Sequence, residues 1–185
     1  MDRGGRRSIA PSRKNIAGLN SGSMQVWIFR HADAEESSES GKDEDRALTR
    51  DGVRRAAAVG RGLAALQPGI EAILTSPYRR ARETARVAAQ ALGLAKVVDP
   101  RSLEPGRDPK AVARELEQSA WRAALLVGHQ PLLGEIIGFL VFGDPRREVP
   151  LRKASVAHVS WTPGGRGTLE ALLPADVLVR LGADG

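Results

Sequence analysis

The 185-residue sequence contains no cysteine, and only 4% of its residues are aromatic. The absence of cysteine excludes disulfide bonds, thiolate metal ligands and a cysteine nucleophile. The low aromatic content argues against a nucleic-acid-binding surface, because such surfaces combine a basic face with aromatic side chains that stack on bases. Hydrophobic residues make up 42% of the chain, which is enough for the core of one globular domain.

Acidic residues are scarce at the N-terminus, so the net charge of +6 is unevenly distributed. Residues 1–23 contain five basic residues and one acidic residue, which leaves a net charge of only +2 for the other 162 residues. This segment also lacks the apolar region of a signal peptide, although its Arg and Ser content leaves an organelle transit role open. We expect residues 1–23 to be a disordered leader or an added extension, and we expect no nucleic-acid partner.

The sequence also lacks an uninterrupted hydrophobic run of about 20 residues, the length that crosses a membrane. Residues 123–143 come nearest, but His129, Gln130, Pro131 and Glu135 interrupt them. A buried strand, a turn and a buried helix explain this segment better than a membrane span. We expect a monomeric, cytoplasmic protein with no membrane partner.

Strand and helix patterns alternate along the chain. Apolar and β-branched runs predict strands at residues 24–30, 70–75, 96–98, 123–128, 155–161 and 167–173. Capping and proline signals predict helices from Thr49 to about Leu66, from Ser76-Pro77 to Leu92 with Gly93 as its C-cap, from Asp108-Pro109 to about Ser119, and from Pro131 to Phe142. The alternation indicates an α/β fold, a single-domain three-layer α/β/α arrangement with a mostly parallel central sheet. We expect this domain to span residues 24–173, followed by a loose C-terminal tail at 174–185.

Polar groups of one kind follow three of the predicted strands. Arg30-His31 ends the first strand, the run from Ser76 to Arg80 follows the second, and Gly128-His129 ends the central apolar strand. Ligands of open α/β sheets bind at the carboxyl ends of strands, so we expect two imidazoles and several guanidiniums to meet at one edge. Arginine offers forked, permanently charged donors to phosphate oxygens, and a neutral imidazole is a nucleophile near pH 7. The sequence therefore predicts a site for a tetrahedral phosphoryl group.

Four segments resemble motifs of the histidine phosphatase superfamily. Arg30-His31-Ala32 is similar to its Arg-His-Gly signature, and the run from Thr75 to Ala81 is similar to its second arginine motif, in which Arg80 is the matching arginine. Gly128-His129 resembles the motif of its second histidine, and Arg46 resembles the arginine that precedes the first helix. The resemblance covers residues 24–173 in the family's order. It implies a phosphoglycerate mutase-like fold, and the short chain and its first strand are most similar to SixA-type phosphohistidine phosphatases.

The resemblance implies a two-step mechanism that needs no metal and no other cofactor. His31 would attack phosphorus and form a phosphohistidine intermediate, which water would then hydrolyse. Arg30, Arg80 and His129 would act with His31 as catalytic residues, and Arg30, Arg46 and Arg80 would bind the phosphoryl oxygens. The implied partner is a protein that carries phosphohistidine. A phosphatase or mutase of small phosphomonoesters remains an alternative, as does a non-enzymatic module that binds phosphate or phosphoproteins.

Three features need a separate interpretation. Ala32 replaces the family's glycine, so we expect ordinary backbone dihedrals at that position. Glu104 is a candidate general acid with a poor match to the family's acid, and a phosphoramidate leaving group depends less on such an acid than an ester does. Residues 33–45 carry seven acidic residues and one lysine. We interpret them as a solvated loop, with a rim that accepts a basic protein surface as the alternative.

Overall fold

A single six-stranded sheet forms the centre of the computed structural model, which describes residues 22–183. The spatial order of the strands is β3-β2-β4-β1-β5-β6; β3, β2, β4 and β1 are parallel, β5 pairs antiparallel with β1, and β6 pairs antiparallel with β5. The strands are β1 (Met24–Arg30), β2 (Ala72–Thr75), β3 (Val97–Val98), β4 (Ala123–Gly128), β5 (Val156–Trp161) and β6 (Thr168–Leu173). The predicted α/β class with a mostly parallel sheet is confirmed.

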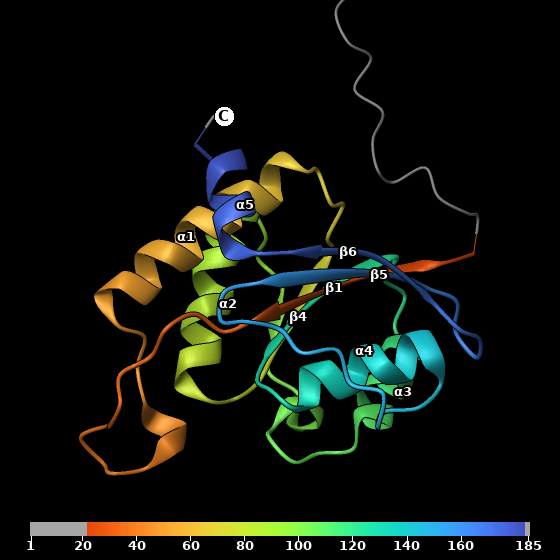
Figure 1. Cartoon of the computed structure of the whole chain (residues 1–185), viewed down its shortest axis with the longest axis horizontal. Helices are drawn as coiled ribbons and strands as arrows, with labels where there is room; N and C mark the ends of the chain where they lie inside the picture. Colours follow the sequence, from red (N-terminus) through yellow and green to blue (C-terminus); the bar gives the residue numbers. More distant parts are fainter. Residues whose placement is uncertain (1–21, 184–185) are drawn as a thin grey trace, which may run out of the picture.

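Helices cover both faces of the sheet and make it the middle of three layers (Figure 1). On one face lie α1 (Arg50–Ala65), α2 (Arg79–Leu92) and α5 (Ala175–Leu181), and on the other lie α3 (Pro109–Glu117) and α4 (Leu132–Phe142). Two 3-10 turns, η2 (Asp43–Asp45) and η3 (Arg101–Leu103), lie in the connections. Helices α1, α3 and α4 begin and end within a few residues of the predicted bounds.

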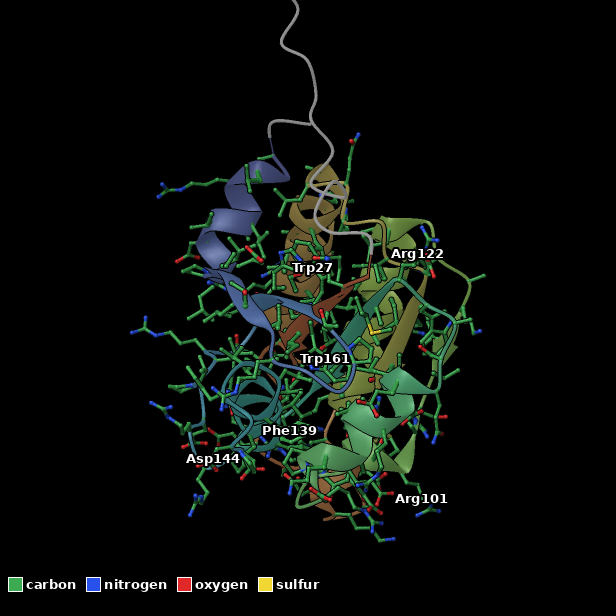
Figure 2. All side chains as sticks on the ribbon, turned by 90° about the vertical axis from the view of Figure 1, so that its right-hand side faces the viewer. Trp27, Arg101, Arg122, Phe139, Asp144 and Trp161 are labelled. Atoms are coloured by element: carbon green, nitrogen blue, oxygen red, sulfur yellow. The ribbon has the colours of Figure 1, made fainter. Side chains whose placement is uncertain are left out.

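Successive side chains of each central strand contribute to opposite cores, as the pleat of a strand requires. In β1, Val26 and Ile28 belong to the core under α3 and α4, whereas Trp27 and Phe29 belong to the core under α1, α2 and α5. Trp27 and Trp161 lie inside the molecule, while Arg101, Arg122 and Asp144 lie at its periphery (Figure 2). A strand that is buried on both faces needs a continuous apolar run, which explains the composition of β1 and β4.

Local capping chemistry sets several helix ends. The Thr49 side chain accepts a hydrogen bond from the Gly52 N–H at the start of α1, and the Asp108 side chain does the same for Lys110 at the start of α3. Gly93 ends α2 with a φ of +67°, as predicted. Helix α2 begins at Arg79 instead of at Ser76-Pro77, because Tyr78 has extended backbone dihedrals and acts as the N-cap.

The C-terminal segment differs from the predicted loose tail, because Ala175–Leu181 form helix α5. Its side chain Leu178 is completely buried, and its Asp176 Oδ1 lies 2.6 Å from Arg55 Nη2 of α1. Gly62 of α1 permits the contact, since a Cβ added there would lie only 1.9 Å from the carbonyl oxygen of Leu178. Such a seven-residue helix carries too short an apolar pattern to be recognised from the sequence alone.

The predicted leader, residues 1–23, falls almost wholly outside the described residues. None of the helices formed by residues 22–183 is long and apolar enough to cross a membrane.

The close contact between α1 and α5 predicts the effect of a single methyl group. Gly62→Ala should destabilise the protein by about 1–3 kcal/mol, because the steric overlap with α5 outweighs the gain in helix propensity. Urea denaturation measures this change, and Arg61→Ala, on the exposed side of α1, is the matched control. Equal stability of the two variants would contradict the packing of α5 against Gly62.

Candidate active site

The carboxyl ends of three parallel strands bring the predicted histidines and arginines to one edge of the sheet. In the strand register, Arg30 of β1 pairs with Gly128 of β4, and Thr75 of β2 pairs with Val127 of β4. The pairing continues past the strand ends, because the His31 N–H donates to the Gly128 carbonyl over 3.0 Å. As a result, the rings of His31 and His129 lie with their centroids 4.9 Å apart.

His31 is held in one orientation and in its neutral form. Only 7% of the residue is exposed, and its Nδ1 lies 2.7 Å from the carbonyl oxygen of Ala32. A carbonyl only accepts hydrogen bonds, so Nδ1 carries the ring hydrogen and Nε2 keeps its lone pair. Burial lowers the pKa of His31 to about 4, against the opposing bond to Ala32, and the positive charges of Arg80 and Arg30 lower it further. At pH 7 this imidazole is therefore a neutral nucleophile.

His129 is a second buried, neutral imidazole. Its Nε2 lies 2.9 Å from Ser76 Oγ, which also accepts a 3.4 Å hydrogen bond from the Tyr78 N–H. Burial is the main cause that lowers the pKa of His129 to about 3, and the nearby His31 and Arg80 lower it further. Its Nδ1 is buried and has no hydrogen-bond partner among residues 22–183. An unpaired buried polar atom costs free energy, which a ligand atom placed there would recover.

Arg80 lies in the first turn of α2 and is 7% exposed. The hydroxyl of Thr84 ties this turn to the end of β1, because it donates to the Arg80 carbonyl and accepts a 3.3 Å bond from the Ala32 N–H. The guanidinium lies 5.1 Å from the centre of the Tyr78 ring, which in turn meets His129 edge-on at 5.2 Å. Tyr78 therefore packs against two of the polar groups of the site.

Arg30 contributes a second cation to this edge. Its Nη1 donates to the Leu151 carbonyl over 2.7 Å, and its buried Nε lacks a partner among the described residues. The Arg30 carbonyl accepts a hydrogen bond from the Ala154 N–H, so the end of β1 is tied to the segment that precedes β5. Ala32, completely buried beside it, has no positive φ, in agreement with the predicted ordinary dihedrals.

Arg46 is connected to the site through Asp43, one of the seven acidic residues of the 33–45 segment, for which the sequence predicted no separate role. Asp43 accepts hydrogen bonds from Arg46 Nη1 at Oδ1 over 2.7 Å and from Arg80 Nη2 at Oδ2 over 2.9 Å. Its main-chain oxygen accepts a further bond from Arg80 Nη1 over 2.7 Å. The hydrogen bond from Arg46 is the main cause that lowers the pKa of Asp43, and Arg80 adds to it.

Asp43, Ser76 and Tyr78 are therefore the residues that sequence reasoning missed. Ser76 and Tyr78 stand inside the motif from Thr75 to Ala81, so their position in it was the available signal. Nothing in the sequence distinguishes Asp43 from the other acidic residues of the 33–45 segment.

Glu104 is not joined to this cluster by any contact within residues 22–183. Its carboxylate pairs with Arg107 and Arg101, which are its neighbours along the chain. The hydrogen bond from Arg107, followed by the charges of both arginines, lowers the pKa of Glu104, whereas a general acid needs a pKa raised toward neutrality. The candidate assignment of Glu104 as general acid therefore has no support in the geometry.

The third histidine of the chain, His158, makes none of these contacts among residues 22–183. His158 stacks on Trp27 with ring centroids 4.0 Å apart, and its Nε2 lies 2.8 Å from Gln25 Oε1, as expected of a structural histidine. Within residues 22–183 no group of three or more His, Asp or Glu side chains is arranged to hold a metal ion.

The buried environments of the imidazoles predict a flat NMR titration. Ring-proton shifts of all three histidines should stay constant between about pH 5.5 and 8, because burial favours the neutral form of each. In the unfolded chain their pKa returns to about 6.5, so the unfolded state binds more protons and stability should fall as the pH drops from about 6.5 toward 4. The urea-unfolded protein is the control, and a folded-state ring that titrates near pH 6.5 would contradict the burial argument.

Comparisons with known proteins agree with this arrangement. The sequence model of the histidine phosphatase superfamily (branch 1) matches residues 26–105. The chain is 38% identical over 139 residues to an uncharacterised protein of Picosynechococcus sp., covering 72% of this chain and 82% of that protein. It is 30% identical over 150 residues to the phosphohistidine phosphatase SixA homolog of Haemophilus influenzae, covering 75% of this chain and 88% of that protein.

A solved structure extends the similarity to three dimensions. The protein histidine phosphatase SixA in complex with tungstate superimposes with a TM-score of 0.77 at 26% identity, covering 84% of this chain and 99% of that one. The two-histidine edge of the sheet, the sequence match and the shared fold lead to one conclusion: the chain belongs to the histidine phosphatase superfamily, and is thus a phosphatase or a mutase.

Proposed function

We propose that this protein is a metal-independent phosphatase that uses His31 as its nucleophile and removes phosphate from phosphohistidine on a protein. The observation that carries the proposal is the pair of neutral imidazoles, 4.9 Å apart and bordered by Arg30 and Arg80. One imidazole offers a free Nε2 lone pair, while buried Arg30 Nε and His129 Nδ1 are unpaired among the described residues. This is the combination that an in-line attack on a phosphoryl group requires.

In the first step, the lone pair of His31 Nε2 forms a bond to phosphorus, and the bond from phosphorus to the leaving imidazole nitrogen breaks. The leaving nitrogen keeps the electron pair and takes a proton from water. In the second step, a water oxygen bonds to phosphorus, the Nε2–phosphorus bond breaks, and the proton of the water passes to solvent. Throughout, the bond from His31 Nδ1–H to the Ala32 carbonyl keeps Nε2 directed at phosphorus and stabilises the charge on the ring.

The remaining groups stabilise the negative charge that spreads over the equatorial oxygens. Arg30 and Arg80 supply permanently charged donors at the edge of the sheet, and Arg46 adds a third through its contact with Asp43. With the Ser76 hydroxyl as donor to His129 Nε2, the ring hydrogen of His129 lies on Nδ1, where it becomes a donor to a phosphoryl oxygen. Ser76 then acts as a positioning residue for His129.

Two observations favour phosphohistidine over small phosphomonoesters. Glu104, the acid proposed from the sequence, is paired with Arg101 and Arg107, and a basic nitrogen leaving group depends less on a protein acid than an alkoxide does. Two of the similar proteins carry the SixA name, and one of them was solved with tungstate, a tetrahedral oxoanion. A phosphatase or mutase of small esters is the second candidate. A binding module without turnover has less support, because binding does not need a nucleophilic imidazole.

The first test compares phosphate release from two substrates. Wild-type protein should release phosphate from a histidine-containing protein domain that was phosphorylated with phosphoramidate, and more slowly from an aryl phosphate, without added metal. His31→Ala should lower both rates by about 1000-fold or more, because it removes the nucleophile. Brief incubation of wild type with substrate should also leave acid-labile, base-stable phosphate on His31.

His158→Phe is the matched control, because it replaces a buried histidine outside the site and keeps an aromatic ring against Trp27. Its rates should stay close to wild type. Release from the aryl phosphate alone would move the substrate to small esters, whereas activity that survives His31→Ala would refute the nucleophile.

Replacing Glu104, in the loop after β3, tests whether this residue acts as a general acid. Glu104→Gln should change turnover of the phosphohistidine domain by less than about 3-fold, because the carboxylate is held deprotonated by its arginines. Steady-state kinetics on both substrates measures the effect. A loss of about 100-fold or more, confined to the ester, would show that Glu104 protonates the ester oxygen after a movement of its loop.

A further inference from the structure

Asp43 occupies an unusual place among the acidic residues of the 33–45 segment. Its two carboxylate oxygens contact different guanidiniums, Oδ1 that of Arg46 and Oδ2 that of Arg80. Its main-chain oxygen gives Arg80 a second acceptor. About half of the Asp43 side chain is exposed, whereas Arg80 lies inside the site, so the aspartate reaches inward from the surface turn η2.

We propose that Asp43 is the positioning residue of the phosphoryl site, which fixes Arg46 and Arg80 as a rigid pair of donors. This inference rests on the proposed function. Two guanidiniums that serve one anion repel each other before the anion arrives, and a carboxylate between them offsets that repulsion. Arranging charged donors before the reaction avoids the cost of reorganising them when charge develops on the phosphoryl oxygens.

The number of N–H donors that Arg46 and Arg80 leave unused shows whether Asp43 positions these arginines or competes with substrate for them. A guanidinium has five N–H donors. Arg80 uses two of them on Asp43, and Arg46 uses one on Asp43 and one on the Glu35 carbonyl. Each arginine therefore keeps about three donors for a phosphoryl group, so Asp43 does not have to leave when substrate binds. The carboxylate aims the two guanidiniums without consuming them.

Neighbouring acidic residues make different contacts, so the role is specific to this one. Asp45, two residues later in the same turn, accepts a 2.6 Å hydrogen bond from the Ser40 hydroxyl, and Glu44 lies 3.9 Å from Lys42. Asp45 shares with Asp43 its charge, its turn and its exposure to solvent. It is therefore the matched control position.

The experiment uses the full chain with Asp43→Asn, Asp43→Glu and Asp45→Asn. Turnover of the phosphohistidine domain is measured as kcat and KM, together with inhibition by orthophosphate and by orthovanadate, which mimics the five-coordinate transition state. Asp43→Asn should lower kcat by about 10- to 100-fold, with a smaller change in KM, because misplaced donors are most costly in the transition state. Asp43→Asn should also weaken inhibition by vanadate more than inhibition by orthophosphate. Asp43→Glu should restore part of the lost kcat, and Asp45→Asn should have the kcat, KM and inhibition of the wild type.

Each other outcome has a defined meaning. Tighter binding of both oxoanions to Asp43→Asn, with kcat kept or raised, would overturn the proposal in favour of a carboxylate that competes with substrate. Identical behaviour of Asp43→Asn and Asp45→Asn would overturn it in favour of a purely solvated loop, and a loss of thermal stability with an unchanged ratio of the two inhibitors would reduce Asp43 to a structural role. A wild type without phosphatase activity refutes the proposed function instead, and vanadate binding by calorimetry then still tests whether Asp43 positions the arginines.

Discussion

The parallel hydrogen bonding of β1 to β4 and of β4 to β2 is the constraint on which the site depends. Each strand ends in a polar motif, and the ladder aligns the three ends so that Arg30 lies beside Gly128 and Thr75 beside Val127. A shift by one residue would turn the side chains of a strand toward the opposite core. The packing of β1 and β4 between the two cores therefore also sets which way His31 and His129 point.

Burial makes the two imidazoles of the site neutral but leaves its arginines charged. It disfavours protonation of both imidazoles, with pKa values of about 4 and 3, while the arginines stay cationic because their intrinsic pKa lies far above neutrality. The same desolvation thus leaves two neutral imidazoles next to permanent positive charges. Asp43 moderates the cationic cluster and links the acidic segment to it through Arg46 and Arg80.

Sequence reasoning succeeded where chemistry follows from local pattern. Thr49, Asp108 and Gly93 mark helix ends through short-range hydrogen bonds or a positive φ, and each acts as predicted. The order of strands and helices, and the grouping of His31, Arg80 and His129 at one edge, follow from the rules of α/β topology. Two of the failures concern contacts between distant segments, and the third concerns a residue that pairs with its neighbours along the chain. Helix α5 depends on a close approach to Gly62, Asp43 depends on the folding back of η2 onto α2, and Glu104 is occupied by its own neighbours.

The sequence by itself determined the fold class, the family and the grouping of two histidines and two arginines at one edge of the sheet, because these depend on periodicity, capping and motifs within short stretches of chain. Only the tertiary structure decided which acidic residue contacts Arg46 and Arg80, how the imidazoles are oriented and how far burial shifts their pKa values. Those properties arise from contacts between segments that are far apart in the sequence, such as Asp43 with Arg80 and Ser76 with His129. The sequence pattern of one segment does not predict such contacts, because both desolvation and charge pairing depend on which other parts of the chain lie nearby in the fold.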